Sequence, residues 1–225
     1  AIPVSDHNLS QRMSTMHRWI RRAAIALTAF ALIGSPTDAS AETQDEIVQR
    51  LRTSRDSERY EVAVDGQSIK AGGARILVQA PLAVVRTIVQ DFAHYQDFMP
   101  RFKRSRVVGQ SPKASQVYLQ VPILHGAANV WSVINFTAPV KKPDGSETIR
   151  GRMIPGQGNV RDFRATWYLV PIDANTTLLR SEILIVPTLP VPGSVVTGEL
   201  GYAADMAVTS TRNRAEAQVR EAAKK

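Results

Sequence analysis

Cysteine is absent from this sequence of 225 residues, and histidine occurs only four times. The absence of cysteine excludes disulfide bonds, thiolate catalysis and cysteine-ligated metals, although it is compatible with an oxidising compartment. The sequence also lacks a glycine-rich phosphate loop, a nucleophile elbow and a pair of carboxylates with catalytic spacing. It therefore predicts no cofactor, no metal ion and no familiar catalytic set.

A hydrophobic run long enough to cross a membrane is also missing. The apolar run at residues 23–34 is about a dozen residues long, whereas a helix needs roughly 20 residues to cross a bilayer. A basic segment precedes this run and an A-x-A pattern at residues 39–41 follows it, which is typical of a secretory signal peptide cut after Ala41. We expect residues 1–41 to be an upstream extension and signal peptide, and the mature protein to be periplasmic or secreted. The alternative is a buried N-terminal helix.

Acidic residues are in the minority, with 20 against 28 basic residues and a net charge of +8. Residues 1–41 hold four arginines and two aspartates, so the rest of the chain has 24 basic and 18 acidic residues and a net charge of +6. This balance favours anionic surfaces, such as phospholipid head groups, lipopolysaccharide or nucleic acid, without choosing among them.

One stretch, residues 81–108, organises the rest of the chain. Pro81 suits the first position of a helix, and apolar residues then recur at helical spacing up to Phe92. A tight aromatic segment and a basic, strand-like run follow. The pattern Asp91-x-x-x-Tyr95-x-x-Phe98-x-Pro100, with Ser105 and Val107 after it, resembles the START-like, polyketide-cyclase and lipid-transport superfamily, which includes coenzyme-Q-binding proteins.

The resemblance covers residues 60–217 and implies an α+β helix-grip fold. In this fold a curved antiparallel sheet wraps around a long C-terminal helix, and short helices follow the first strand. Gln96 stands where the family often has proline, which affects the turn more than the fold. We expect residues 42–58 to form an N-terminal helix and linker, and residues 59–225 to form the START-like domain.

The order of periodic segments agrees with this architecture. Alternating apolar residues and turn signals predict closely spaced antiparallel strands, and an Asp-Gly turn at residues 144–145 marks one hairpin. Helices are predicted at residues 44–53 and 194–223. Strands are predicted at residues 60–64, 76–80, 101–109, 115–124, 129–140, 147–154, 160–171 and 177–186, with a glycine- and proline-rich connection before residue 160.

The final helix presents small residues where a core-filling helix usually presents large ones. Two interpretations are open: a close contact between helix and sheet, or an apolar pocket that a ligand completes. Parity along the strands places one set of candidate ligand contacts on the inner face: Phe163, Trp167, Leu169, Leu179 and Ile183. Further candidates are Tyr118, Trp131, Leu200, Tyr202 and Met206. Ordinary core packing is the alternative role for each.

Four basic residues fall within six positions: Arg101, Lys103, Arg104 and Arg106. They predict a positive rim that contacts anionic lipid head groups. The alternatives are a charged edge strand that deters sheet pairing and a nucleic-acid site with Phe102 as a stacking ring. Export argues against nucleic acid, so we expect none as a partner, and we expect a monomer.

The leading functional hypothesis is an exported, non-enzymatic binder or carrier of a hydrophobic molecule of the lipid, isoprenoid or quinone class. Its expected partners are this small molecule and an anionic membrane surface. A rival is a cyclase or dehydratase that uses His94, Tyr95 and Asp97 at a pocket mouth. A third hypothesis is an envelope interaction module without a ligand. An internal void of a few hundred cubic ångströms would favour the first hypothesis over the third.

Overall fold

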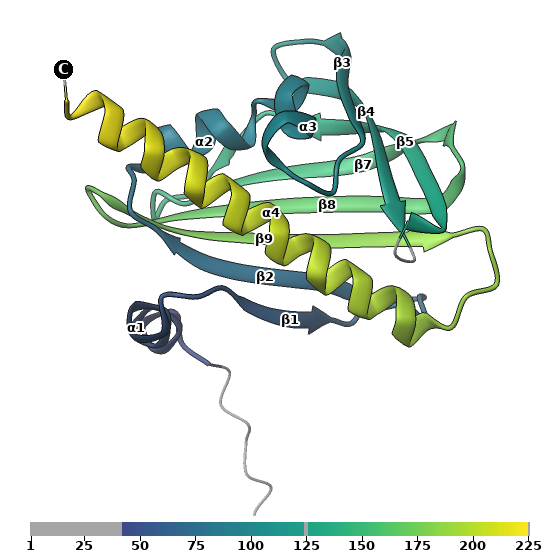
Figure 1. The fold of residues 1–225 in the computed structure, drawn as a ribbon, viewed down its shortest axis with the longest axis horizontal. Coiled ribbons are helices and arrows are strands. Elements are labelled where there is room, and N and C mark those ends of the chain that lie inside the picture. The colour runs from purple at the N-terminus through teal and green to yellow at the C-terminus, as the bar shows by residue number, and fades with distance from the viewer. Residues whose placement is uncertain (1–41, 124–125, 225) are drawn as a thin grey trace, which may run out of the picture. The chain divides into compact units, whose positions relative to one another are not determined.

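The computed structural model describes residues 42–123 and 126–224 (Figure 1). The segment for which the sequence predicts an upstream extension and a signal peptide, residues 1–41, lies outside the described residues. The cleavage site and the export that it implies therefore stay predictions.

A nine-stranded antiparallel sheet forms the body of the described chain, in the order β1-β2-β9-β8-β7-β5-β4-β3, with β6 paired to β7. The sheet is open, because β1 and β3 are its two edges. This confirms the predicted antiparallel architecture. The strands are β1 (Glu58–Val62), β2 (Ala71–Val78), β3 (Arg104–Gln110), β4 (Ala114–Ile123), β5 (Ala128–Thr137), β6 (Val140–Lys141), β7 (Glu147–Gly158), β8 (Val160–Asp173) and β9 (Thr176–Pro187).

Helices cover both faces of the sheet. The long helix α4 (Gly193–Ala222) crosses the inner face, as Figure 1 shows, and α2 (Leu82–Val89), η1 (Phe92–His94) and α3 (Tyr95–Phe98) lie on the same side. The helix α1 (Gln44–Ser54) packs on the opposite face, where its residues Ile47, Val48 and Leu51 form an apolar cluster with Leu77, Val170 and Leu178. The long C-terminal helix on an antiparallel sheet confirms the helix-grip fold.

The N-terminal helix is fixed by local signals at both ends. Thr43 and Glu46 form a capping box, in which each side chain bonds the other residue's backbone N–H. Arg55 ends the helix in the left-handed conformation, with φ of 59°. These caps explain why the helix begins and ends within a residue of its predicted limits.

The aromatic segment of the family resemblance is part of the core. Phe92 stacks on Phe136 with ring centroids 4.6 Å apart, and it meets the Tyr95 ring edge-on. The Tyr95 hydroxyl donates a hydrogen bond to the carbonyl of Val89, and the Ser105 hydroxyl donates one to the carbonyl of Phe92. The motif therefore joins α2, η1 and α3 to the sheet.

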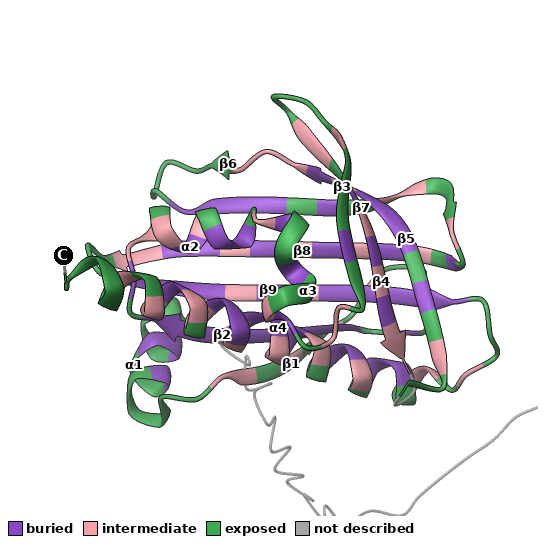
Figure 2. Cartoon of the chain, turned by 45° about the horizontal axis from the view of Figure 1, so that its top comes forward, coloured by how far each residue is buried: buried purple, intermediate pink, exposed green. Residues whose placement is uncertain are grey.

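The alternation of residues along β8 and β9 predicted correctly which side chains lie on the inner face of the sheet, towards α4. Phe163, Trp167 and Leu169 on β8, and Leu179 and Ile183 on β9, are all buried in the main apolar cluster between the sheet and α4. Figure 2 shows this burial along the strands that lie under α4.

Several predicted boundaries differ from the structure. β2 begins at Ala71, five residues before the predicted strand, so Gly72 and Gly73 lie within it. Pro81 is the residue that precedes α2 and not its first helical residue. The connection predicted before residue 160 is instead the end of β7. Ser132 pairs with Gly158 while Ile134 pairs with Met153, so residues 154–157 bulge out of the ladder opposite one residue of β5. Gly156 has φ of +77°, a conformation that suits glycine in such a bulge.

The small residues of α4 allow a close approach to β2. A Cβ atom added to Gly72 would lie 2.1 Å from the backbone N of Gly201, so the two backbones are almost in contact. Gly201, Ala204 and Ala207 are buried on this side of the helix. Close contact, the first of the two interpretations of the small-residue face, is therefore correct on the side of α4 that faces β2.

Candidate ligand-binding pocket

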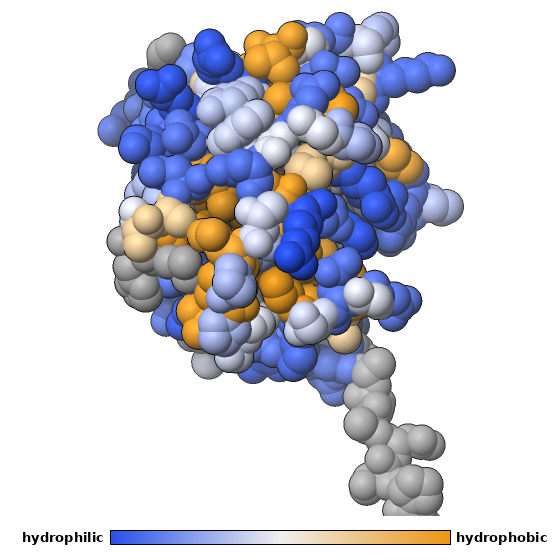
Figure 3. All heavy atoms as spheres, turned by 90° about the vertical axis from the view of Figure 1, so that its right-hand side faces the viewer, coloured by the Kyte–Doolittle hydropathy of each residue, from blue (hydrophilic) through white to orange (hydrophobic). Residues whose placement is uncertain are grey.

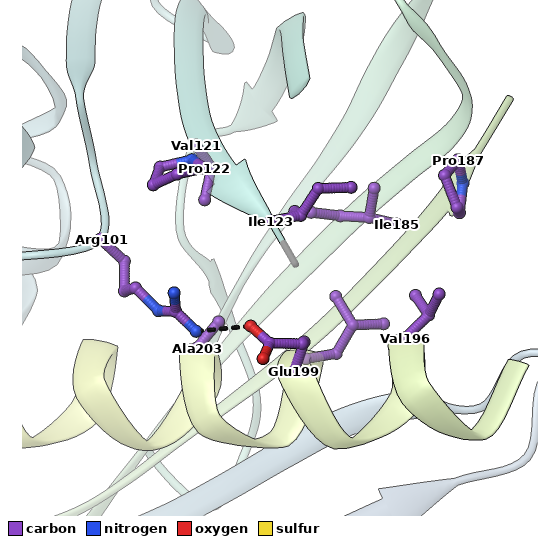
Figure 4. A pocket seen from close by; sticks show the side chains of 10 residues that line it. Arg101, Val121, Pro122, Ile123, Ile185, Pro187, Val196, Glu199 and Ala203 are labelled. Atoms are coloured by element: carbon purple, nitrogen blue, oxygen red, sulfur yellow. Dashed lines mark hydrogen bonds and ion pairs between the residues drawn. The ribbon is translucent and has the colours of Figure 1, made fainter. Parts of the chain in front are cut away.

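An apolar pocket lies on the other side of α4, between the first turns of the helix and the ends of β4 and β9 (Figure 4). The view of Figure 3 faces one side of the molecule and shows apolar side chains gathered in a hollow, with polar side chains around them. The pocket is lined by Arg101, Val121, Pro122, Ile123, Ile185, Pro187, Val196, Glu199, Leu200 and Ala203.

The cavity inside this pocket measures about 20 Å³. This is room for about one water molecule. This pocket therefore lacks the void of a few hundred cubic ångströms that a resident ligand would need. Leu200 and the inner-face residues Phe163, Trp167 and Leu179 occupy the interior instead, and each has at most 4% of its surface exposed.

A charged pair crosses the mouth of the pocket. Nη2 of Arg101 lies 2.7 Å from Oε2 of Glu199, as the dashed line in Figure 4 marks. The two side chains are only 19% and 16% exposed, and the guanidinium carbon lies 4.7 Å from the centroid of the Tyr202 ring. The ion pair and the stacked ring fix the position of Arg101 and link the segment before β3 to α4.

The ten candidate ligand contacts are spread over four places in the structure. Leu200 lines the pocket, and Tyr202 lies beside it with 42% of its surface exposed. The β8 and β9 candidates are core residues, and Met206 is half-buried outside the pocket lining. Tyr118 and Trp131 are on the outer face, since Val117, Leu119 and Val130 of the same strands are in the core. Whether these residues contact a ligand stays a prediction.

Trp131 and Tyr118, whose side of the sheet the sequence left open, both lie on the outer face. The Trp131 ring stacks on that of Tyr118 with centroids 5.8 Å apart, and the guanidinium carbon of Arg106 lies 5.4 Å from the Tyr118 ring. These three side chains stack in a row across β3, β4 and β5. On β4 and β5 the alternation of the sequence separates the two faces without indicating which of them is inner.

Sequence reasoning missed Glu199 and Pro122. Glu199 was detectable in principle, because it is a charged residue on the helix face that also carries Val196 and Ala203. Its role depends on Arg101, which is 98 residues away along the chain. No periodic signal connects two such positions.

The basic run divides into two parts. Arg101 faces the pocket, and its charge is balanced by Glu199. Lys103, Arg104 and Arg106 are exposed. Arg104 and Arg106 are on β3, which is an edge strand, and Lys103 directly precedes it. Arg101 is therefore not part of a free positive rim in this structure, and contact of the other three with head groups stays a prediction.

The three residues of the enzymatic rival do not meet at a pocket. Tyr95 is buried, and burial together with the Asp91 charge raises the pKa of its hydroxyl well above the ordinary range. Asp97 is exposed, and none of the three lines the pocket. Within residues 42–123 and 126–224, no group of three or more potential ligands is arranged to hold a metal ion.

His94 is half of an exposed ion pair with a testable pKa. Its Nδ1 lies 2.5 Å from Oδ1 of Asp91, and this hydrogen bond raises the pKa of His94 above its usual value of about 6.5. Because the folded-state pKa is the higher one, the pair stabilises the fold fully below about pH 6.5 and loses this contribution as pH rises through the folded pKa.

We expect the His94 ring signals in an NMR titration to shift with a midpoint above 6.5. Replacing Asp91 by asparagine removes the charge that favours the imidazolium, so Asp91→Asn should lower this midpoint towards 6.5. A wild-type midpoint at or below 6.5 would contradict the ion pair.

None of the described helices is both long enough and apolar enough to span a membrane.

No protein-family model matches this chain, and neither does any curated protein sequence. Solved structures do match its fold. The STAR-related lipid transfer protein of Xanthomonas axonopodis is 18% identical with a TM-score of 0.62, and the match covers 71% of this chain and 93% of that one. Human StAR-related lipid transfer protein 5 is 9% identical with a TM-score of 0.62, over 78% of this chain and 95% of that one.

The Zhui aromatase/cyclase from a Streptomyces species is 14% identical with a TM-score of 0.55, and the match covers 74% of this chain and 98% of that one. Proteins named for lipid transfer and an enzyme thus share one architecture with this chain. At these identities the likeness concerns the fold alone. The fold of this chain is the START-like helix-grip fold, as the resemblance of residues 60–217 implies.

Proposed function

We propose that this protein is an exported, non-enzymatic binder or carrier of a hydrophobic molecule of the lipid, isoprenoid or quinone class. The observation that carries the proposal is the apolar pocket between α4 and the ends of β4 and β9. Eight of its ten lining residues are apolar, and such a lining is typical of small-molecule sites. Two of the matching structures carry lipid transfer in their names, which supports the same class of ligand.

Binding requires the pocket to open, because its present volume of about 20 Å³ does not admit such a molecule. The segment at residues 188–192 between β9 and α4 is the part best suited to move. It is mostly exposed and contains Leu189, which has 52% of its surface in solvent, followed by Val195 with 46% in the first turn of α4. A ligand that entered here would gain about 25 cal/mol for each Å² of apolar surface removed from water.

Delivery from a membrane would fit the exposed charges of the basic run. Lys103, Arg104 and Arg106 are exposed and basic, and anionic head groups attract such residues over about one Debye length. Exposed Leu189 and Val195 would then meet the apolar layer. Export rests on the signal-peptide pattern of residues 1–41.

A pocket-filling variant tests the proposal. Ala203 lines the pocket, so we expect Ala203→Phe to abolish or weaken at least tenfold the binding of Nile red, a neutral fluorescent hydrophobe. Ala222→Phe is the control, because Ala222 is exposed near the end of the same helix. Equal binding by both variants and the wild type would place the dye elsewhere and contradict the proposal.

A second candidate function is supported by the filled interior. With a cavity of about 20 Å³, the domain is also suited to be an envelope interaction module that needs no ligand. The same titration separates the two functions. An interaction module would show no saturable binding of Nile red. Ala203→Phe would then give the same titration as the wild type.

A further inference from the structure

Arg101 has a hydrogen-bond donor that nothing in the described chain satisfies. Its Nε atom is buried, and no described residue accepts a hydrogen bond from it. The guanidinium is always charged, and leaving one of its donors unpaired inside a protein is destabilising. The donor belongs to a residue that lines the pocket, where eight of the lining residues are apolar.

Among the described residues, Glu199 balances the charge of Arg101 at this site. Glu199 occupies Nη2 of Arg101 at 2.7 Å, and both side chains are mostly buried. A second carboxylate would stand close to Glu199 in surroundings of low polarity, where like charges repel strongly. A neutral oxygen would accept the hydrogen bond from Nε without adding charge. The unpaired donor and the balanced ion pair therefore both favour a neutral hydrogen-bond acceptor.

We propose that the pocket binds a hydrophobic molecule through a neutral oxygen acceptor, such as a ketone or ester carbonyl, which accepts a hydrogen bond from Nε of Arg101. This inference rests on the proposed function and specifies its ligand. The apolar lining from β4, β9 and α4 holds the hydrocarbon part. Arg101 holds the oxygen, and Tyr202 and Glu199 keep the guanidinium in place.

Three ligands of equal chain length test the inference: nonane, 2-nonanone and nonanoate, each measured by displacement of Nile red. The diagnostic variant is Arg101→Lys, which keeps a positive charge opposite Glu199 but has no Nε. The matched control is Arg104→Lys, the same substitution at an exposed position on β3. Comparing each ligand across the variants cancels the differences in water solubility among the ligands.

We expect Arg101→Lys to weaken 2-nonanone about tenfold while it leaves nonane unchanged, since a hydrogen bond to a charged group contributes about 1.5 kcal/mol or more. Nonanoate should bind the wild type more weakly than 2-nonanone, and Arg104→Lys should behave as the wild type with all three ligands.

Two results would overturn the inference and leave the proposed function standing. One is an equal response of nonane and 2-nonanone to Arg101→Lys, and the other is nonanoate binding more tightly than the ketone. Failure of every ligand and of Nile red to bind the wild type would overturn the proposed function and this inference together.

Discussion

Replacing Gly72 by alanine is expected to lower the free energy of unfolding by about 3 kcal/mol, which is a large effect for one methyl group. The new Cβ atom would lie 2.1 Å from the backbone N of Gly201 and 2.2 Å from the carbonyl carbon of Leu200. Because both neighbours are backbone atoms of α4, no side-chain rotation can relieve the overlap. The helix would have to move away from β2.

The control for this substitution lies on the other side of the same contact. A Cβ atom added to Gly201 meets nothing within 4 Å, so Gly201→Ala should be tolerated. Alanine is favoured over glycine in a helix interior by about 1 kcal/mol, and the variant should be slightly more stable. Urea unfolding of both variants measures the difference. Equal stability of Gly72→Ala and the wild type would mean that α4 does not lie this close to β2.

Removing the partner of a buried carboxylate is expected to have an effect of similar size. The Glu147 side chain is 3% exposed, and its Oε1 lies 3.4 Å from Nη1 of Arg86 on α2. Its Oε2 has no hydrogen-bond partner among the described residues. Arg86→Met should leave this carboxylate poorly compensated and lower the free energy of unfolding by about 3 kcal/mol. Lys141, 4.0 Å away and largely exposed, would compensate it only in part.

A double substitution separates this electrostatic effect from lost packing. Glu147→Gln removes the buried charge, so the double variant Arg86→Met, Glu147→Gln should recover most of the stability that Arg86→Met loses. Thermal or urea unfolding of the wild type and the three variants completes the cycle. Losses that simply add would show that the Arg86–Glu147 pair contributes nothing beyond its separate side chains.

The sheet and its helices were predictable because their signals are local. Alternation along β8 and β9 placed Phe163, Trp167 and Leu179 on one face, and the aromatic motif indicated the superfamily fold. The bulge at residues 154–157 was missed because its glycine and proline resemble those of a loop. Met153 and Gly158, on either side of the bulge, pair with β5, and the sequence does not encode this pairing locally.

The site was less predictable than the fold. The small residues of α4 indicated either close contact or a pocket, and the structure has close contact at Gly72 and a small pocket beside Ala203. The volume of a pocket depends on how large side chains such as Leu200 pack, which no spacing rule gives. The Arg101–Glu199 pair joins distant parts of the chain, so composition suggested only that Arg101 was one of several surface cations.

The most direct test of ligand binding in this pocket is to locate a bound hydrophobic molecule by isotope-filtered NMR, with a labelled chain and unlabelled 2-nonanone. We expect intermolecular contacts to the methyl groups of Ile123, Ile185, Val196 and Leu200, which line the pocket. Contacts confined to exposed Val107, Val108 and Val140, or no contacts at saturating ligand, would contradict binding in this pocket.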